Sequence, residues 1–547
     1  MYSVGVNALG NDVSVAIVRE DGVIVALAEE ERYSGVKGST RAATAEWVWS
    51  VLDEFSVPPR DVTHLTFPRI QAHHLLRAPG AGADPVAARA GDGYATLVRT
   101  LAARLPNLLT VAEVRHHTAH AASAMCTATT ADPTGVTCDG VGEVQTAGIH
   151  VRTPQGLRTL WSRRLPHSLG LVYEAVADWL GLDGVEKEGK LMGLSAYGQP
   201  TQVELLTKEV FDPVTFELDG GQDRTPDELK REIRSRLVAA IGPGTAAPGE
   251  FYSPQQLEIA ASAQAVAEDA LARLIAHSFD LHRAEEVACA GGVFLNSLAN
   301  GRLLASSPYR HHWVPPFVGD TGSSLGAALL ALGSPRVDLD SPFLGSELGA
   351  VDRDPPAGYW SVPLDREWST QVAGWLLDGW IIGWAEGRSE VGPRALGHRS
   401  ILASAFDQRT RDRLNDTIKQ REGWRPFAPV VIEEDTPALF GGCRTVTYMN
   451  QVLDCVAPQL VPSGVHVDDT ARVQTVGDEP AMSRLRQLLL AVKERRGHGV
   501  VINTSLNVRG MPIARSLDDV ARTALDCSLD AVVLDGVAWV RHDRAPR

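Results

Sequence analysis

Apolar residues recur along the chain with two different periods. In residues 1–18 and 23–28 they alternate with small or polar residues around an Asp-Gly turn, which predicts a β-hairpin. Elsewhere they recur every three or four residues, which predicts helices with one buried face. Such helices are predicted at residues 44–55, 168–180, 254–279 and 370–377, and further strands at 62–67, 287–290 and 381–385. Alternating strands and helices indicate α/β domains.

Two apolar strands run into glycine-bearing turns that are followed by helical segments. One turn contains Gly291, Gly292 and Asn296, and the other contains Asp320. In open α/β sheets such turns face nucleotides. Together they fit the second lobe of a two-lobed ATPase, and the opening hairpin, with Asp12 in its loop, fits the start of the first lobe. A plain β-hairpin is the commoner explanation of that opening.

The composition between residues 333 and 358, rich in Pro, Ser and Asp, is typical of a connecting segment. A chain of 547 residues is too long for one ordinary core. We therefore predict a first domain at residues 1–345, a linker at 346–365 and a second α/β domain at 366–547.

Three segments of the first domain are predicted to lie outside its core. Residues 78–93 are rich in Ala, Gly and Pro, and residues 188–198 combine three glycines with a lysine, so both are predicted to be loops. The second of these contains Lys190 and Gly193 and is expected to lie close to a ligand. The charged residues among 30–37 are predicted to form a solvated face.

The charge and the cysteines exclude several classes of protein. The net charge is -15, without the clustered basic excess that a nucleic-acid surface needs. The six cysteines lie far apart with no Cys-x-x-Cys pair, which indicates reduced thiols in a cytoplasmic protein. The sequence contains no run of about eighteen apolar residues, so no membrane span is predicted. We expect a cytoplasmic protein that contacts neither nucleic acid nor membrane.

His116 and His120 are the strongest candidates for metal ligands. Small residues surround them and favour a helix, on which the two imidazoles lie one turn apart on the same face. A His-x-x-x-His pair alone is a weak signal, but Asp320 supplies a carboxylate as a third ligand. Two histidines and one carboxylate leave coordination positions open, as in catalytic iron(II) or similar divalent sites.

An Asp139-Gly140 turn follows another predicted strand. Its glycine lets backbone amides approach an anion, and the carboxylate can face a metal or a bound hydroxyl group. The same dipeptide is also among the most ordinary hairpin turns, so the functional and the structural interpretation stand about even.

Cations in the second domain alternate with Gly, Pro and Trp, which a solvated charge run does not explain. Planar guanidinium groups bind phosphate with two parallel hydrogen bonds, so these residues predict an oxyanion site. A buried strand that ends in amides and hydroxyls follows them. The candidate residues are Arg388, Arg394, Arg399, Lys419, Arg421, Arg425, Asn503, Ser505 and Asn507.

Motifs along nearly the whole chain resemble those of the O-carbamoyltransferases of nodulation-factor and antibiotic biosynthesis, of the tobramycin and cephamycin type. The motifs are residues 189–194, 387–397, 425–429 and 503–507. The resemblance implies a two-lobed actin-like (ASKHA) first domain, similar to the tRNA threonylcarbamoyl-transfer protein. It also implies a second domain similar to the YrdC-type carbamoyl-adenylate synthases.

The resemblance also implies a mechanism. Lys419, Arg421, Ser505 and Asn507 would hold carbamoyl phosphate and ATP, the latter with Mg(II), which react to carbamoyl-adenylate and pyrophosphate. Fixed cations suit this step because they screen the repulsion between two anions. In the first domain Fe(II), or another divalent metal, on His116, His120 and Asp320 would orient the adenylate for attack by a hydroxyl.

Two residues near the metal ligands have less certain roles. His117 lies off the helical face that His116 and His120 share, and it is expected to contact either the substrate or a residue that binds the metal. In the first loop, relatives usually have His-Asp where this chain has Asn11-Asp12. Asp12, or a water molecule oriented by the backbone, is therefore the candidate catalytic base.

The expected acceptor is a hydroxyl group on a small molecule. The resemblance narrows it to a glycosylated natural product, on whose sugar we expect the hydroxyl; a homodimer is left open. Threonylcarbamoyl transfer and hydrogenase maturation are the alternatives. An actin-fold sugar kinase would not need the second domain, and a non-catalytic regulator would be expected to have lost the histidines or arginines.

Overall fold

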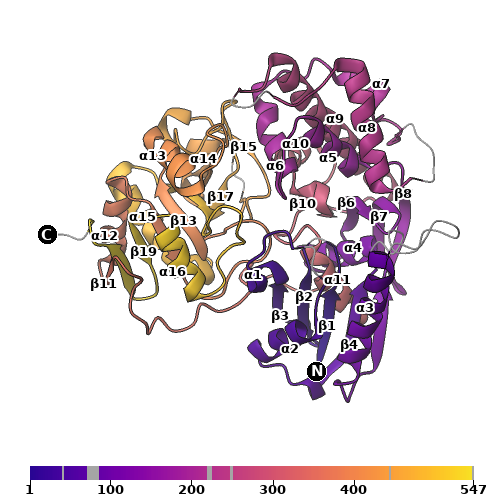
Figure 1. Cartoon of the computed structure of the whole chain (residues 1–547), viewed down its shortest axis with the longest axis horizontal. Coiled ribbons are helices and arrows are strands. Elements are labelled where there is room, and N and C mark those ends of the chain that lie inside the picture. Colours follow the sequence, from indigo (N-terminus) through magenta and orange to yellow (C-terminus); the bar gives the residue numbers. More distant parts are fainter. Residues whose placement is uncertain are drawn as a thin grey trace. The chain divides into compact units, whose positions relative to one another are not determined.

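A computed structural model describes residues 1–10, 12–39, 42–69, 85–218, 224–246, 250–442 and 445–544, with the backbone alone described for 85–92. The chain divides into two compact units (Figure 1). The first comprises Met1–Glu31 and Gly38–Asp340, and the second comprises Arg32–Lys37 and Ser341–Arg547.

The first unit begins with a five-stranded sheet in the order β3-β2-β1-β4-β5. The first three strands form an antiparallel meander, and β4 and β5 extend it in parallel from β1. The bounds are β1 Tyr2–Asn7, β2 Ser14–Arg19, β3 Ile24–Glu29, β4 Val62–Pro68 and β5 Thr110–Val114. The predicted opening hairpin is thus two strands of a larger sheet.

The second sheet of this unit repeats the same topology in the order β10-β9-β6-β7-β8. Again three strands form an antiparallel meander, and two more extend it in parallel from the first. The bounds are β6 Thr134–Gly142, β7 Gln145–Thr153, β8 Gly156–Arg164, β9 Glu286–Ala290 and β10 His311–Trp313. The first unit is therefore built from two copies of one five-stranded plan.

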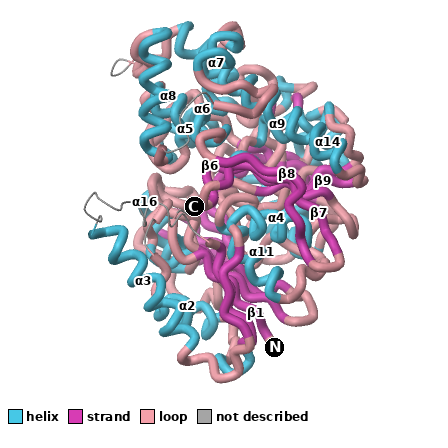
Figure 2. The backbone as a smooth tube through the Cα atoms, turned by 90° about the vertical axis from the view of Figure 1, so that its right-hand side faces the viewer, coloured by secondary structure: helices cyan, strands magenta, loops and turns pink. Residues whose placement is uncertain are grey.

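Two helices lie between these sheets (Figure 2). Helix α4 (His116–Cys126) follows the first sheet in sequence but packs on β6 and β9 of the second. Helix α11 (Thr321–Ala331) follows the second sheet but packs on β1, β2 and β4 of the first. Each sheet is thus covered by the helix of the other half, and the two helices pack against each other.

Small residues let α4 and α11 approach closely. A Cβ atom on Gly326 would lie 1.8 Å from the carbonyl oxygen of Ala119. In the same way α11 approaches β1, where a Cβ atom on Gly5 would lie 1.9 Å from the carbonyl oxygen of Ser324. These contacts are with backbone, which cannot move aside as a flexible side chain can. Helix α4 is packed on every side, and ten of its residues are buried. This packing explains why its sequence is rich in alanine.

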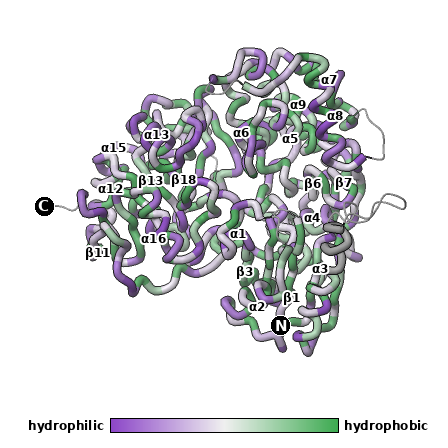
Figure 3. The backbone as a smooth tube through the Cα atoms, viewed as in Figure 1, coloured by the Kyte–Doolittle hydropathy of each residue, from purple (hydrophilic) through white to green (hydrophobic). Residues whose placement is uncertain are grey.

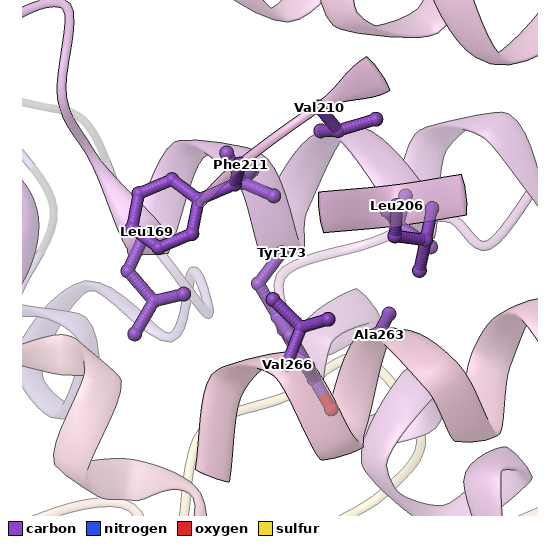
Figure 4. A pocket seen from close by; sticks show the side chains of 9 residues that line it. Leu169, Tyr173, Leu206, Val210, Phe211, Ala263 and Val266 are labelled. Atoms are coloured by element: carbon purple, nitrogen blue, oxygen red, sulfur yellow. The ribbon is translucent and has the colours of Figure 1, made fainter. Parts of the chain in front are cut away.

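The remaining helices of the first unit surround the sheets. Among the described residues, none is long and apolar enough to cross a membrane. A cavity of about 10 Å³ between α5, α7 and α9 has room for about one water molecule, and apolar side chains line it (Figure 4). It is a packing gap rather than a substrate site. The bounds are α2 Ala45–Glu54, α3 Pro85–Ala102, α5 Leu169–Trp179, α6 Lys187–Leu194, α7 Val203–Glu209, α8 Pro226–Ile241, α9 Pro254–Leu281 and α10 Ser297–Ser306. Helix α1, Glu30–Ser34, begins in the first unit and ends in the second.

The second unit contains an eight-stranded mixed sheet in the order β11-β20-β19-β12-β13-β18-β14-β17. A short pair, β15-β16, stands apart from it. The strands are β11 Tyr359–Pro363, β12 Ile382–Ala385, β13 Arg399–Ser404, β14 Ala428–Ile432, β15 Leu453–Asp454, β16 Thr470–Ala471, β17 Gln474–Val476, β18 Val500–Ser505, β19 Ala531–Val533 and β20 Val537–Arg541. The helices are α12 Trp368–Leu377, α13 Gln408–Arg413, α14 Thr436–Phe440, α15 Ser483–Arg496 and α16 Leu517–Asp526.

The central strands of this large sheet are buried on both faces and are mostly apolar. In β13, Ile401 and Ala403 belong to the core under α16, whereas Leu402 belongs to the core under α12 and α15. Successive residues of a strand point to opposite faces, which gives two cores from one sheet. Figure 3 shows apolar residues along the strands of both units.

All four predicted helices are confirmed, the last of them as α12, and side-chain caps fix the first residues of the other three. Helices α2, α5 and α9 follow Thr44, Ser168 and Ser253, whose side-chain oxygens accept hydrogen bonds from the first turn. Such caps satisfy amide groups that have no partner inside the helix.

Two predicted loops are helical instead. The loop predicted at 78–93 is wrong from residue 85 onward, because α3 runs through it; residues 78–84 lie outside the described residues. The glycine-rich stretch 188–198 forms most of α6. Lys187, at the start of α6, pairs with Asp178 at 2.6 Å and Glu174 at 2.9 Å on α5, and these tertiary ion pairs outweigh the weak helix propensity of glycine.

The predictions for residues 346–365 and 30–37 also need correction. The predicted linker 346–365 contains β11, which pairs with β20 and anchors itself through Tyr359, whose hydroxyl donates to Ala524 and Leu529 carbonyls. The charged residues near 30–37 are not a solvated face throughout, because Arg32 is buried. Its guanidinium group finds backbone carbonyls in the second unit.

Gly326→Ala should destabilise the protein by at least about 2 kcal/mol, because the added methyl group would overlap the Ala119 carbonyl. Urea unfolding measures this loss. The matched control is Gly93→Ala in α3, where an added Cβ meets nothing within 4 Å. That variant should gain up to about 1 kcal/mol from reduced backbone entropy. Equal stability of the Gly326 variant and the wild type would show that the helix crossing is looser than described.

Candidate active site

Four donor atoms converge between the two sheets of the first unit. The Nε2 atoms of His116 and His120 lie 2.9 Å apart. Asp320 Oδ1 lies 3.3 Å from the first and 3.2 Å from the second, and Asp139 Oδ2 lies 3.4 Å and 3.1 Å from them. One donor atom from each of the four residues lies within 4.8 Å of all the others.

The backbone explains why these side chains meet. His116 begins α4, and His120 follows one turn later. Asp320 immediately precedes α11, yet its carboxylate makes no capping hydrogen bond and stays available to the histidines. Asp139 lies on β6, and its Oδ1 accepts a hydrogen bond of 2.7 Å from the Gly140 backbone amide. Its other oxygen, Oδ2, is therefore left to face the imidazoles.

The donor set fits a divalent cation. Metal–ligand bonds of about 2.0–2.2 Å bring neighbouring donors to within roughly 3 Å of one another. Two imidazoles with two carboxylates suit iron(II), zinc or a similar ion, and the carboxylate charges match two positive charges. His116, His120, Asp139 and Asp320 would be the residues that hold it. Asp139 joins the three predicted ligands as a fourth.

The electrostatics of the cluster point the same way. Burial alone would lower the pKa of His116, but the carboxylates of Asp320 and Asp139 raise it to about 10. Burial opposes ionisation of Asp139, yet its hydrogen bonds with His116 and His120 lower its pKa well below the usual value. The half-buried carboxylates of Asp139 and Asp320 therefore favour positive charge beside them, from imidazolium or from a metal ion.

Asp12 lies beside this cluster. Burial, followed by the charges of Asp320 and Glu29, raises its pKa well above the usual value. Its backbone is left-handed, with φ of 55°, and the Asn7 amide donates both to the Asp12 carbonyl at 3.1 Å and to the Asp320 carbonyl at 3.4 Å. Asn7 thus ties the first loop to the metal-ligand turn. Asn11 lies outside the described residues.

His117 points away from the four donors, toward the β6–β7 hairpin. Its Nδ1 lies 2.8 Å from Thr137 Oγ1, and its Nε2 lies 3.0 Å from the carbonyl oxygen of Gln145. Burial lowers its pKa well below the usual value, so the ring is neutral. Both ring nitrogens thus have protein partners, and its catalytic role remains a prediction.

Two of the predicted glycines shape the surroundings of Asp139. Gly291 has φ of 99°, and a Cβ on it would lie 2.3 Å from the Cys138 carbonyl oxygen. A Cβ on Gly292 would lie 3.0 Å from Asp139 Oδ1. Larger residues here would push Asp139 out of place. Asn296 lies further away, where it caps α10 and exchanges hydrogen bonds with Gln264.

Lys190 and Gly193 lie on α6. The Lys190 ammonium pairs with Asp183 at 3.1 Å. Their role in binding a cofactor remains a prediction.

A second polar cluster forms in the second unit around Lys419. Lys419 is the last residue of a π-helix, Leu414–Lys419, and Gln420 after it is left-handed with φ of 44°. This turn directs the buried ammonium toward Ser505 and Asn507. Lys419 Nζ donates to Asn507 Oδ1 at 2.7 Å and to Ser505 Oγ at 3.3 Å, and Ser505 Oγ donates to Asn507 Oδ1 at 2.7 Å.

Comparison with known proteins gives the family. Residues 92–329 match the family described as "Carbamoyltransferase N-terminus", and residues 373–541 match "Carbamoyltransferase C-terminus". The nodulation protein NolNO of Sinorhizobium fredii is 30% identical over 99% of this chain and 80% of its own length. The chain belongs to the carbamoyltransferase family. The resemblance stated from the sequence motifs is thereby confirmed.

Other relatives and structures vary in what they show. The 3'-hydroxymethylcephem-O-carbamoyltransferase of Streptomyces clavuligerus is 32% identical over 68% of each chain. The activator of the 2-hydroxyisocaproyl-CoA dehydratase from Clostridium difficile covers 61% of this chain and 94% of its own, with 13% identity and a TM-score of 0.35. HypF of T. kodakarensis covers 61% and 47%, with 15% identity and a TM-score of 0.29. The structural likenesses are too weak to carry an argument.

Of the predicted tetrad in this carbamoyltransferase, three members meet and one lies to the side. Arg421 donates to Asn415 Oδ1 at 2.8 Å and to the Pro426 carbonyl at 3.1 Å, and it stacks over the Phe427 ring at 4.3 Å. Arg425 lies 3.8 Å from Glu422.

Two of the arginines predicted to bind phosphate, Arg388 and Arg399, donate hydrogen bonds to backbone carbonyl groups instead. Arg399 is completely buried and donates to the carbonyls of Glu386, Gly387, Ser346 and His398. Binding a phosphate would require it to leave these partners. Arg388 donates to the carbonyls of Gly345 and Leu344, Arg394 is half-buried on the same loop, and buried Asn503 donates to Ala395 and Gln474.

Metal binding to this carbamoyltransferase should release at least about one proton per ion near neutral pH. The reason is that carboxylates raise the pKa of His116 to about 10, so the ring is protonated there and must lose its proton to bind. Metal affinity should therefore rise with pH. Calorimetric titration with iron(II) or zinc in buffers of different ionisation enthalpy measures the release.

Two variants provide the controls for this titration. Asp139→Asn keeps the shape of the ligand but removes its charge, and should weaken metal binding at least about tenfold. Asp21→Asn removes an exposed carboxylate that pairs with Arg19, and should change nothing. If Asp139→Asn bound the metal as tightly as the wild type, and neither protein released a proton, the four-donor site would be excluded.

Proposed function

We propose that this carbamoyltransferase works in two steps at two sites. In the second unit, carbamoyl phosphate, ATP and water would give carbamoyl-adenylate, phosphate and pyrophosphate. In the first unit, the hydroxyl of an acceptor would attack the carbamoyl carbon, so that a carbamate ester forms and AMP and a proton leave. The observation that carries the proposal is that the predicted ligands form two separate clusters, one in each unit.

The Lys419 cluster suits the first step. Joining carbamate to the α-phosphate of ATP brings two anions together, and a fixed ammonium group lowers the repulsion between them. Ser505 and Asn507 hold the Lys419 ammonium through its hydrogen bonds, so its direction is set before substrate arrives. Mg(II) would accompany ATP, and Arg394 and Arg421 remain the predicted additional cations.

The four-donor cluster suits the second step. A divalent metal, which we propose to be iron(II), would supply a Lewis acid that polarises the carbamoyl carbonyl. The first turns of α4 and α11 meet here, and the positive ends of helix dipoles favour an anionic adenylate. Asp12 has a raised pKa and lies beside the cluster, so its carboxylate would accept the proton of the acceptor hydroxyl.

The proposal includes the finer fold assignments. The repeated five-stranded topology and the exchanged helices of the first unit support the two-lobed actin-like (ASKHA) fold. The YrdC-like assignment of the second unit rests on the resemblance of its motifs.

We propose a small hydroxylated molecule as the acceptor, and specifically a sugar hydroxyl of a glycosylated natural product. The Streptomyces relative is named as a 3'-hydroxymethylcephem-O-carbamoyltransferase, so the acceptor of that protein is a hydroxymethyl group on a small molecule. A chain with a net charge of -15 is also poorly suited to tRNA. Carbamoyl transfer to tRNA or to a protein, without turnover of any glycoside, would reject this choice.

The two steps should separate by mutation. Lys419→Met should lower carbamoyl phosphate-dependent pyrophosphate release by at least about a hundredfold, because it removes the fixed charge where two anions meet. His120→Ala should leave that release largely intact while abolishing transfer to an acceptor. Coupled phosphate assays and product mass spectrometry measure the two steps.

Lys208→Met is the matched control, since its side chain is 80% exposed and lies on α7. It should behave as the wild type in both assays. If the Lys419 and His120 variants instead fail at the same step, the division of labour between the units is wrong.

A further inference from the structure

A six-residue segment from the N-terminal part of the chain belongs to the second unit. The chain enters that unit at Arg32 and leaves it at Lys37, although Met1–Glu31 and Gly38 onward belong to the first. The two first-unit residues that flank this segment are joined by a hydrogen bond of 2.8 Å from the Gly38 amide to Glu31 Oε2. We call residues Arg32–Lys37 the strap.

Arg32 is one residue that holds the strap in the second unit. This residue is only 6% exposed, and its guanidinium group donates through Nη1 to the Glu390 carbonyl at 2.5 Å and through Nη2 to the Gly392 carbonyl at 2.8 Å. The next residue adds two contacts: the Tyr33 hydroxyl lies 3.3 Å from Ser346 Oγ, and Arg515 stacks over the Tyr33 ring at 4.4 Å.

The loop that Arg32 holds carries the cations predicted for the adenylation site. Residues 386–394 contain Arg388 and Arg394, and Arg399 fixes the beginning of the same loop through the Glu386 and Gly387 carbonyls. Arg32 therefore fixes the carbonyls of residues 390 and 392, which the guanidinium group of Arg399 does not hold. Both are fork-shaped donors that pin two carbonyls at once, a geometry that lysine does not reproduce.

The side chain of Glu390 ties this part of the loop to the sheet. Its Oε1 accepts hydrogen bonds from the backbone amides of Leu396 at 2.6 Å and Arg399 at 3.2 Å. Arg32 and Glu390 together close the turn that contains Arg394 from both ends. A loss of the Arg32 donors would leave the carbonyls of Glu390 and Gly392 without those hydrogen bonds and would loosen the turn.

We infer that Arg32 is a positioning residue for the adenylate-forming reaction, supplied to the second unit by the N-terminal part of the chain. The inference rests on the proposed function for its catalytic consequence, although the contacts themselves do not. It follows that residues from 341 onward do not form a complete adenylation unit. The position of Arg394 then depends on a segment more than three hundred residues earlier in the sequence.

The test compares full-length Arg32→Met with the wild type in two measurements. Hydrogen exchange followed by mass spectrometry should show faster exchange in peptides that cover residues 386–397, with the first-unit peptides around α4 unchanged. The KM for carbamoyl phosphate in pyrophosphate release should rise about tenfold with a smaller change in kcat, since a looser loop binds the anion less well.

Two further variants separate positioning from general folding. Arg32→Lys keeps the charge but not the fork, and it should fall between the wild type and Arg32→Met; it also serves if the Met variant does not fold. Arg32→Ala should regain part of its activity when guanidinium ion is added at millimolar concentration. Arg19→Met, at an arginine that is 45% exposed on β2, should match the wild type throughout.

The outcomes distinguish the inference from the proposed function. Unchanged exchange and unchanged KM in Arg32→Met, with pyrophosphate release still lost in Lys419→Met, would overturn the positioning role and leave the proposed function standing. If the wild type released no pyrophosphate, the proposed function would fail. The exchange of the 386–397 peptides would then decide the positioning role alone.

Discussion

The close crossing of α4 and α11 is the constraint on which the first unit depends. Gly326 and Ala119 let the two backbones meet, and the same crossing brings His116 and His120 to Asp320. Because each helix packs on the sheet of the other half, the four donors are held by both halves of the duplicated fold. A change in helix separation would therefore alter stability and the geometry of the four donors together.

The second unit uses buried charge rather than close helix packing to build its site. Lys419 and Arg399 are buried cations whose hydrogen bonds go to neutral oxygens of loops and strand ends, and Arg32 does the same from a distant part of the sequence. Buried charges need hydrogen-bond partners in fixed positions, so each of them orders the backbone around it. That order is what a site for small anions requires, since phosphate binding depends on donors set in advance.

The sequence predicted local features well and tertiary ones in part. The helical spacing of His116 and His120 is a local property and is enough to pair them. The Asp139-Gly140 turn leaves a metal-facing and a purely structural role about even, and only the packing of β6 against α4 brings this carboxylate to both imidazoles. Three glycines made 188–198 look like a loop because the ion pairs of Lys187 are tertiary. Burial of Arg32 and Arg399 was missed for the same reason: charged residues in sequence give no sign of the carbonyls that will surround them.

The central claim is that His116, His120, Asp139 and Asp320 hold one metal ion at the place where carbamoyl transfer occurs. X-ray absorption at the metal edge of the iron-loaded protein tests it most directly. The account predicts a shell of nitrogen and oxygen donors with imidazole scattering from two rings, reduced to one ring in His120→Ala. A shell that contains sulfur, or imidazole scattering that is unchanged in that variant, would contradict it.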